Sequence, residues 1–451
     1  MIRFISFLTS LVLTMSILAG CGAGDVHFEK ESTEEQETIE VTNALADEKV
    51  LPYGLSDVTL NYLSSLDKTV DLYFLMELGE LRGEKELEDL VNLLDSYASF
   101  EQINFKDLSP DENPEIINLL DPDGTYDLSS GDVILRCDNS IMCVKASKFY
   151  SYITDDNGII KEQLFHGENL ITGAIKAVAE NIIPVIYFTT GHGEKEFETD
   201  YTQFSKNLIN ANYIPMSLDL SAEASVPENA AAVIIAAPQS DISEDERAKL
   251  ENYMDKGGNL SLLMSPNGSN TEYENISEIM MQYGLAMNYD TVSETNSSNH
   301  ILGDNSTILA NVTDMSSVSD EIGDLTSMLR ETESSPCYMP ASRSVYCIQA
   351  NNASDIIACP LIETYETAVS EPFGGYSDYN DKLSGILCLA ALSQDKSRNN
   401  SKVVFMGNAE FISDEHVMEG YTMIPVMLYL STVSWMRSSE LDMGIAPKTI
   451  N

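Results

Sequence analysis

Basic residues are scarce in this chain of 451 residues, where 25 lysines and arginines stand against 72 aspartates and glutamates, a formal net charge of −47. A surface this acidic repels phosphate backbones, so we expect no nucleic-acid partner. The excess of acid is typical of a solubilising coat on a protein that works outside the cytoplasm. No Asp-x-Asp-x-Asp-Gly loop of the calcium-binding kind occurs, and Asp121–Gly124 is better explained as a turn.

The usual sequence signatures of catalysis are also missing. There is no Gly-x-Ser-x-Gly nucleophile elbow, no phosphate-binding loop, no dinucleotide fingerprint and no Cys-x-x-Cys pair. No cysteine follows a strand at a place where a nucleophile is needed. The sequence therefore predicts a protein without cofactor, metal or complete catalytic constellation, and we expect a non-catalytic role.

Long apolar runs are absent except at the N-terminus. Met1–Gly20 carries one charge, Arg3, and an apolar core over Phe4–Leu18, and it ends in Leu-Ala-Gly before Cys21. This order is typical of a bacterial lipoprotein signal peptide with Cys21 as the acylated residue. An uncleaved anchor is the alternative, but the run is short for a span of about 20 residues. We expect a protein anchored by lipid, such as palmitate, to the extracytoplasmic face of the cell membrane.

Cysteine usage leaves the redox state open. Apart from Cys21 there are six, an even number that is compatible with disulfides in an oxidising compartment. They are Cys137, Cys143, Cys337, Cys347, Cys359 and Cys388. The first two pairs in this order are close enough in sequence to bridge hairpins, yet buried free thiols fit the same spacing. The pattern does not decide between them.

Residues 21–50 are rich in Glu, Thr and Ser and are expected to form a flexible acidic tether. Residues 51–165 then predict a thioredoxin-like βαβ unit with a hairpin and without Cys-x-x-Cys. Its expected elements are a helix over Ser56–Leu66, a strand over Val70–Met76, a helix over Glu84–Ser99, a strand over Ile103–Leu108, and a hairpin of Asp132–Cys137 with Ile141–Lys145.

The rest of the chain, 166–451, predicts an α/β domain. The apolar run that begins Ile182–Glu194 and the runs Ala231–Ala237 and Asn259–Ser265 read as buried strands, with an amphipathic helix over Ser243–Lys256. Strands that are apolar throughout indicate a mostly parallel sheet covered by helices on both faces. The polar stretch 288–340 is expected to be an insertion or an irregular loop.

The candidate binding loop follows the first of these strands: Thr190, Gly191, His192, Gly193 and Glu194. Loops at the carboxyl ends of parallel strands are where α/β proteins build their sites. His192 and Glu194 have the chemistry of an acid/base pair or of two metal ligands, whereas a sharp glycine turn with a structural histidine is the simpler interpretation. The segment Asn408–Phe411 follows another strand and is expected to border the same edge.

Several of these blocks together resemble the auxiliary component of gliding-motility-type ABC transporters. The resemblance covers roughly Ser56 to Lys448. It is carried by Phe165–Glu168 with the helix after it, Val185–Glu194, Ala237–Gln239 with Ser243–Leu263, Lys402–Ser413 and Ile445–Lys448, and upstream by Leu66–Val70 and Asn113–Glu115.

The resemblance implies a thioredoxin-like part followed by an α/β domain similar to class I glutamine amidotransferases without their nucleophile. It also implies an accessory subunit whose partners are an ABC-2-type permease and, indirectly, its ATPase. Members of the family usually have membrane helices at both ends, whereas this sequence begins with a lipobox and stops at Asn451. The alternatives are a surface hydrolase or a solute-binding lipoprotein that uses the His192/Glu194 loop.

Overall fold

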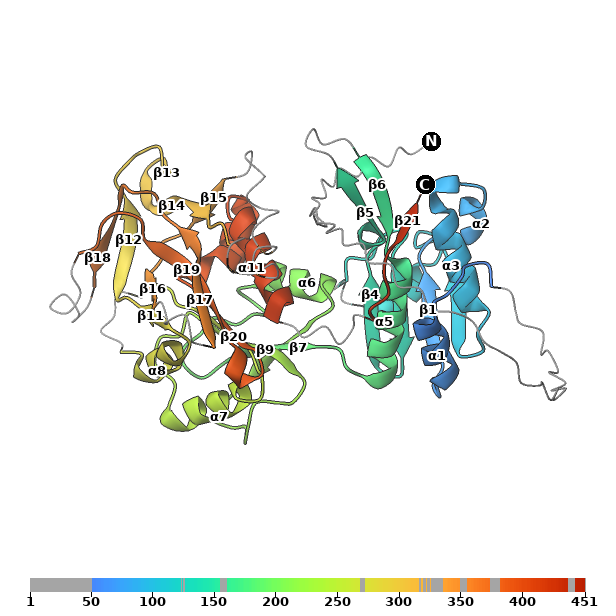
Figure 1. Cartoon of the computed structure of the whole chain (residues 1–451), viewed down its shortest axis with the longest axis horizontal. Coiled ribbons are helices and arrows are strands. Elements are labelled where there is room, and N and C mark those ends of the chain that lie inside the picture. The colour runs from blue at the N-terminus through green and yellow to red at the C-terminus, as the bar shows by residue number, and fades with distance from the viewer. Residues whose placement is uncertain are drawn as a thin grey trace, which may run out of the picture.

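The computed structural model describes residues 51–450, apart from 123, 125, 155–159, 268–271, 316–317, 319–321, 323–324, 326–335, 349–354, 374–381 and 437–442. The expected signal peptide, Cys21 and the acidic tether lie outside these residues. The described elements form a mixed α/β architecture in two halves, each with its own sheet (Figure 1).

The first half is built on a four-stranded sheet with the order β2–β1–β3–β4. The strands are β1 (Val70–Phe74), β2 (Ile103–Asp107), β3 (Val133–Cys137) and β4 (Ser140–Val144). β1 is parallel to β2 and antiparallel to β3, and β3 forms a hairpin with β4. The strands and the hairpin expected in this region are confirmed.

Helices cover both faces of this sheet, and successive side chains of β1 pack against opposite faces. Leu72 belongs to one apolar cluster with Leu94 and Ile175, whereas Tyr73 belongs to another with Leu120. The helices that contribute these residues are α3 (Glu88–Ala98), α5 (Gly167–Glu180) and α4 (Pro114–Leu120), and α1 (Asp57–Ser65) precedes β1.

The division expected between residues 165 and 166 falls just before α5, yet α5 packs on β3 and β4 of the first sheet. A hairpin of β5 (Tyr150–Thr154) and β6 (Ile160–Phe165) precedes that helix. The end of the chain returns here, since β21 (Lys448–Ile450) pairs with β6. The chain therefore leaves the first half after α5 and comes back at its C-terminus (Figure 1).

The second half contains a ten-stranded sheet with the order β13–β14–β17–β19–β20–β10–β9–β7–β8, in which β15 pairs with β14. Its parallel part consists of β8 (Ile214–Leu218), β7 (Val185–Thr189), β9 (Ala230–Ala236), β10 (Leu260–Leu263) and β20 (Ser401–Met406). From β20 outward the pairs are antiparallel through β19 (Cys388–Asp395), β17 (Ile356–Glu363) and β14 (Asp304–Val312).

The expectation of a mostly parallel sheet is therefore wrong in its extent, because only five of these strands are parallel to one another. The sequence analysis missed β19, although it is an almost wholly buried strand. Such a strand accepts apolar residues on both faces whether its neighbours are parallel or antiparallel, so composition alone does not give its direction.

The prediction of helices on both faces of this sheet is confirmed. In β7, Val185 and Tyr187 pack in a cluster with Leu250, whereas Ile186 and Phe188 pack in another. The first face is covered by α7 (Glu244–Met254) and α8 (Glu274–Gln282), and the second by α6 (Thr202–Asn210) and α11 (Met423–Met436). Among the described residues no helix has both the length and the apolar character to cross a bilayer.

The polar stretch 288–340 is not an irregular loop throughout. Its described part contains β12 (Asp290–Glu294), β13 (His300–Ile301), β14 and β15 (Cys337–Met339). β12 pairs with β18 (Ala368–Pro372), and β11 (Leu285–Met287) pairs with β16 (Val345–Cys347). In β12 the half-buried Thr291 and Ser293 alternate with the buried Asp290, Val292 and Glu294, which is the two-residue period of a strand.

Candidate functional site

The Gly-His-Gly-Glu loop lies where the order of the large sheet reverses. From β7 the chain passes through α6 to β8 on one side, and then crosses to β9 on the other side of β7. Such a reversal leaves the loops after the two central strands free to approach each other at the carboxyl edge. Here they meet directly, because the backbone N–H groups of Gln239 and Ser240 donate to the His192 carbonyl over 2.7 and 3.1 Å.

The side chain of His192 is buried, and both of its ring nitrogens face carboxylates. Nδ1 lies 3.0 Å from Oε1 of Glu194, and Nε2 lies 3.1 Å from Oε2 of Glu246. The backbone N–H of His192 also donates to Oε2 of Glu194 over 2.7 Å, and the Thr189 hydroxyl donates to Oε1 over 2.9 Å. A histidine between two buried acids is held in its doubly protonated, charged form.

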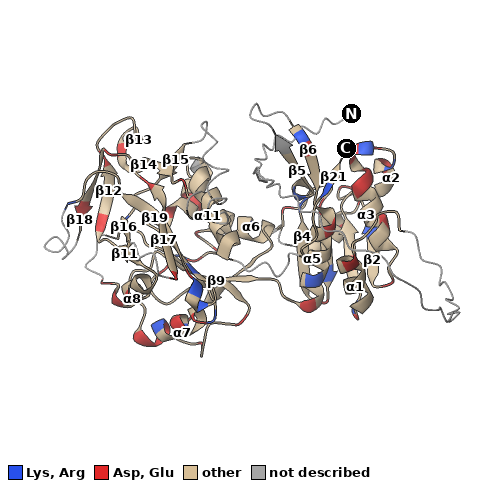
Figure 2. Ribbon diagram, viewed as in Figure 1, with Lys and Arg blue, Asp and Glu red and all other residues tan. Residues whose placement is uncertain are grey.

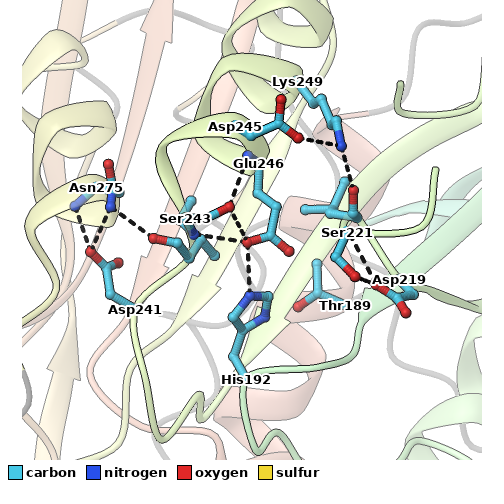
Figure 3. A network of polar contacts seen from close by, with 12 residues as sticks. Thr189, His192, Asp219, Ser221, Asp241, Ser243, Asp245, Glu246, Lys249 and Asn275 are labelled. Carbon is cyan, nitrogen blue, oxygen red and sulfur yellow. Dashed lines mark hydrogen bonds and ion pairs between the residues drawn. The ribbon is translucent and has the colours of Figure 1, made fainter. Parts of the chain in front are cut away.

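Glu246 comes from the first turn of α7, where it completes a capping box with Ser243. The hydroxyl of Ser243 accepts from the Glu246 N–H, and the Ser243 N–H donates to Oε2 of Glu246 over 2.8 Å. The same oxygen receives the His192 contact, as Figure 3 shows. The sequence Ser-Glu-Asp-Glu at 243–246 thus forms a helix start that also binds the loop after β7.

The protonation states follow from these contacts. Hydrogen bonding to Glu194, and further attraction by both carboxylates, raises the pKa of His192 to about 9 although burial opposes this. Burial by itself would raise the pKa of Glu194, but its hydrogen bonds to His192, to backbone N–H groups and to Thr189 hold it below the usual range. The pKa of Glu246 is likewise lowered, against burial, by Ser243 and His192.

Polar contacts extend from this triad to the neighbouring loops (Figure 3). Lys249 of α7 donates to the Leu220 carbonyl over 2.9 Å and pairs with Asp245 at 2.6 Å, which fixes the segment after β8. Asp241 accepts from the backbone N–H of Asn275 over 2.7 Å and so holds the start of α8. Three loops and two helix starts are therefore joined at one edge of the sheet.

Glycine is required at the two glycine positions of the loop for different physical reasons. Gly191 has φ +107 and an added Cβ would meet nothing within 4 Å, so the backbone angle alone demands glycine. Gly193 has φ +80, and an added Cβ would lie 2.9 Å from Cβ of Gln239. The close approach of the loops after β7 and β9 therefore depends on Gly193.

This geometry favours the structural interpretation of the loop. His192 has neither nitrogen available for a substrate or a metal, and its carboxylate partners are occupied by hydrogen bonds. The exposed part of the candidate loop is the backbone at Gly191 and Gly193, beside half-buried Thr190 and Glu194. In the described part of the chain no group of three or more His, Cys, Asp or Glu side chains is arranged to hold a metal ion.

The segment after β20 does approach the same edge. Nζ of Lys195, which follows the loop, lies 3.0 Å from both carboxylate oxygens of Glu410. Asn408 has a structural role, since it is fully buried and its amide donates to the Ser342 hydroxyl over 2.7 Å. Asp414 then accepts from the Thr202 hydroxyl over 2.6 Å. The exposed Lys195–Glu410 pair is thus the accessible polar feature that joins the two segments.

The other described histidines do not join this edge. His166 contacts the Ser151 hydroxyl at 2.7 Å, His300 contacts the Ile301 carbonyl and His416 contacts Ser413. Burial lowers the pKa of His166. Each of the three is engaged locally, and His27 lies outside the described residues.

All six cysteines of the described residues are free thiols. The hairpin partner of Cys137 is Ser140 and that of Cys143 is Ile134, so the pair Cys137/Cys143 is not placed across the hairpin. The thiols of Cys347 and Cys388 instead hydrogen-bond to each other, from β16 and β19. This pair could not be predicted from spacing, because the two residues are 41 positions apart.

Sequence reasoning also missed Arg343, a fully buried arginine beside the carboxyl ends of β10 and β20. In the sequence it lies between Ser342 and Ser344, and the segment matches no motif. Only the fold brings its aromatic and carbonyl neighbours together.

One of the comparisons with known proteins finds a family match that includes the loop. Residues 183–307 match the model of the family described as ABC-type uncharacterized transport system. A comparison with curated proteins gives no match. Two solved structures are similar. The mmIFT52 N-terminal domain has 15% identity and a TM-score of 0.41, and the match covers 55% of this chain and 97% of that one. The exo-beta-1,4-mannosidase Op5Man5 from Opitutaceae bacterium strain TAV5 has 10% identity and a TM-score of 0.29, and the match covers 62% of this chain and 40% of that one.

Likeness at these TM-scores carries no argument about fold or activity. The family match is different, because it contains β7, the Gly-His-Gly-Glu loop and α7, and so includes the whole His192 triad. The resemblance seen in the sequence is confirmed over this region: residues 183–307 match the model of the ABC-type uncharacterized transport system family, which supports an ABC transporter auxiliary component.

Proposed function

We propose that this chain is a non-catalytic accessory subunit of an ABC-2-type transporter, anchored by lipid at Cys21 to the extracytoplasmic face of the membrane. The family match over residues 183–307 supports association with an ABC transport system. The lipobox and the strongly acidic composition support the location. Aspartate and glutamate residues occur along the ribbon of both halves, which agrees with a solvated outer surface (Figure 2).

One observation carries the non-catalytic part of the proposal. The Gly-His-Gly-Glu loop is closed on itself, because His192 is buried and contacts Glu194 and Glu246 at 3.0 and 3.1 Å. A general base must reach the proton that it removes, and neither nitrogen of this ring is directed to solvent. The loop therefore shapes the edge of the sheet, and the exposed Lys195–Glu410 pair lies where a partner would contact it.

The hydrolase alternative loses its main support for the same reason. A solute-binding role at this edge of the sheet needs a polar side chain that is free to contact the solute. The His192 triad does not supply one, because both ring nitrogens face carboxylates.

We also propose that the first half is a thioredoxin-like unit and that the second resembles class I glutamine amidotransferases. The order β2–β1–β3–β4, with β1 and β2 parallel and helices on both faces, supports the former. The parallel core β8–β7–β9–β10–β20 with a loop at the strand-order reversal supports the latter. The division between the two then lies after α5 rather than before it.

The test is co-purification of the full lipoprotein from detergent-solubilised membranes after mild cross-linking, followed by mass spectrometry. We expect a polytopic permease and its cytoplasmic ATPase among the cross-linked partners. Cys21→Ser should release the protein from the membrane fraction and remove both partners. Recovery of the protein alone, together with turnover of a defined substrate, would overturn the proposal.

A second variant tests the edge itself. Lys195→Glu replaces an attractive pair with two like charges on the surface and leaves the buried triad unchanged. If the edge contacts the transporter, this variant should stay folded and membrane-bound while the yield of the permease falls several-fold. An unchanged yield would place the contact elsewhere on the subunit.

A further inference from the structure

Arg343 is completely buried, and its backbone is fixed at the end of β20. Its N–H donates to the Gly407 carbonyl over 2.8 Å. A Cβ added at Gly407 would lie 2.3 Å from the Arg343 carbonyl oxygen, so the two backbones are as close as glycine permits. The side chain is therefore held in one place beneath the carboxyl edge of the large sheet.

Three aromatic rings surround the guanidinium. Its central carbon lies 5.3 Å from the ring centre of Tyr273, 5.2 Å from that of Tyr289 and 4.8 Å from that of Phe373. Each distance is within the range of a cation–π contact. The hydroxyl of Tyr273 donates to the Pro238 carbonyl over 2.6 Å, which ties this wall to the segment after β9.

The hydrogen bonds of the guanidinium are incomplete. Nε donates to the Ser265 carbonyl over 3.2 Å, and Nη2 lies 3.5 Å from Oδ1 of Asn267. Nη1 is buried and has no hydrogen-bond partner. Asp290 does not supply one, since its oxygens accept from the N–H and the hydroxyl of Ser344 over 2.9 and 2.7 Å.

A buried charge normally has a counter-ion, because burying an ion without a partner costs several kcal/mol. Burial lowers the pKa of Arg343, and electrostatic interactions with Tyr273, Tyr289 and Asp290 offset this only in part. The rings stabilise the cation but accept no hydrogen bond in the plane of the guanidinium. At the Nη1–Nη2 end, Nη1 thus lacks an acceptor and Nη2 has only the long contact to Asn267, and a carboxylate matches that end of the fork with two parallel hydrogen bonds.

We propose that Arg343 is the anchor of a binding site for a small organic carboxylate, which lies between the Tyr289 and Phe373 rings and accepts hydrogen bonds from Nη1 and Nη2. Tyr289 and Phe373 are only half-buried, unlike Tyr273, so the side of the cage nearest to solvent is theirs. Asn267 forms the third side of the site. The site does not involve the His192 loop and does not depend on association with a transporter.

Carboxylate is favoured over phosphate by charge. The chain has a net charge of −47, so a dianion is repelled more strongly than a monoanion on its way to the site. One arginine with two free donor directions satisfies a monoanion, whereas a phosphate dianion would keep acceptor oxygens without donors.

The experiment measures thermal unfolding of the full mature chain in acetate or in inorganic phosphate, with ionic strength held constant by sodium chloride. We expect acetate to raise Tm by about 3 °C at ten times its dissociation constant. Phosphate at equal concentration should have at most half of that effect. Arg343→Gln should lose the response to acetate.

A variant that keeps the arginine protects the test against simple misfolding. Asn267→Asp places a carboxylate beside Nη2 and supplies the missing counter-ion from within the chain. It should raise Tm in the absence of acetate and remove the response to added acetate. The matched control is Asn305→Asp, an exposed asparagine on β14, which makes the same charge change and should leave the response intact.

Two results would overturn the site. One is a wild-type protein whose Tm does not change with acetate while Asn267→Asp lowers Tm, because the cage would then be complete without an anion. The other is an acetate response that persists in Asn267→Asp. A larger shift with phosphate than with acetate would overturn the assignment to carboxylates.

Discussion

Nε2 of His192, in the loop after β7, lies 3.1 Å from Oε2 of Glu246, the third residue of α7, although 54 positions separate them in the chain. The same oxygen accepts from the N–H of Ser243 and so belongs to the helix cap. One imidazolium thereby joins the turn after a central strand to the start of the helix that covers the next one. The Gly-His-Gly-Glu loop therefore connects the end of β7 to the start of α7.

Replacing His192 with alanine is therefore expected to reduce stability. The change leaves Glu194 and Glu246 buried without their common cation, and breaking a buried ion pair costs about 3 to 5 kcal/mol. Urea unfolding at pH 7 should report a loss of about 3 kcal/mol. His300→Ala removes a contact to one backbone carbonyl and should cost less than about 1 kcal/mol. A loss at His192 as small as that of the control would contradict the structural role.

The same triad predicts how stability depends on pH. The folded pKa of His192 is about 9, above its ordinary 6.5, so its contribution is complete below about 6.5 and disappears as pH rises through about 9. The two carboxylates have lowered pKa values, so their contribution is present above about 4.5 and is lost as pH falls below it. The His192 part amounts to about 3 kcal/mol at most.

The measurement is the difference in unfolding free energy between the wild type and His192→Gln at a series of pH values. Glutamine keeps a polar side chain but does not titrate, so the difference isolates the histidine from the cysteines, tyrosines and lysines that titrate in the same range. It should shrink between pH 6.5 and 9. A difference that stays constant over that interval would show that the histidine is neutral in the folded protein.

Much of the architecture could be predicted from the sequence because it follows from local patterns. The apolar run at Val185–Thr189 and the capping sequence at Ser243 specify a buried strand and a helix start without knowledge of distant residues. The partner of His192 could not be predicted in this way. Glu246 looks like an ordinary acid in a first helical turn, and only the crossing of the chain at β7 places it beside the loop.

The strand direction at β19 and the position of Arg343 are long-range properties of the same kind. β19 pairs antiparallel with β20 although both are buried apolar runs, and no residue in either encodes the choice. The aromatic residues around Arg343 come from segments up to 100 positions apart. Composition shows that tyrosines are plentiful but not that three rings surround one cation.

Alanine substitutions at Gly191 and Gly193 should separate the cost of backbone strain from the cost of a steric contact. Gly191→Ala strains a positive φ with open space around it, which should cost about 1 kcal/mol. Gly193→Ala adds a Cβ at 2.9 Å from Gln239, so the loop after β9 must also shift, and we expect about 2 to 3 kcal/mol. Thermal unfolding of the two variants side by side checks the order. Equal losses would mean that the two loops do not depend on their close approach.

The Lys195–Glu410 pair should contribute little to stability even though it marks the edge of the site. Lys195 is 42% exposed and Glu410 is 31% exposed in their side chains, so water screens their attraction. Lys195→Ala should change the free energy of unfolding by less than about 1 kcal/mol. Urea unfolding beside the His192→Ala variant tests this contrast. A loss comparable to that of His192→Ala would show that the pair is part of the fold.

Cys347 differs from the other described cysteines in the direction of its pKa shift and should therefore be the most reactive of them. The hydrogen bond from Cys388 lowers the pKa of Cys347 against the effect of burial, whereas burial raises the pKa of Cys143, Cys337 and Cys359 to about 12. The thiolate is the nucleophile, so iodoacetamide at pH 8 should label Cys347 first, as peptide mapping by mass spectrometry would show. Cys388→Ala removes the donor and should slow the labelling, while Cys388→Ser keeps a hydroxyl donor and should preserve it. Equal rates in both variants would mean that exposure alone, and not the hydrogen bond, sets the reactivity of Cys347.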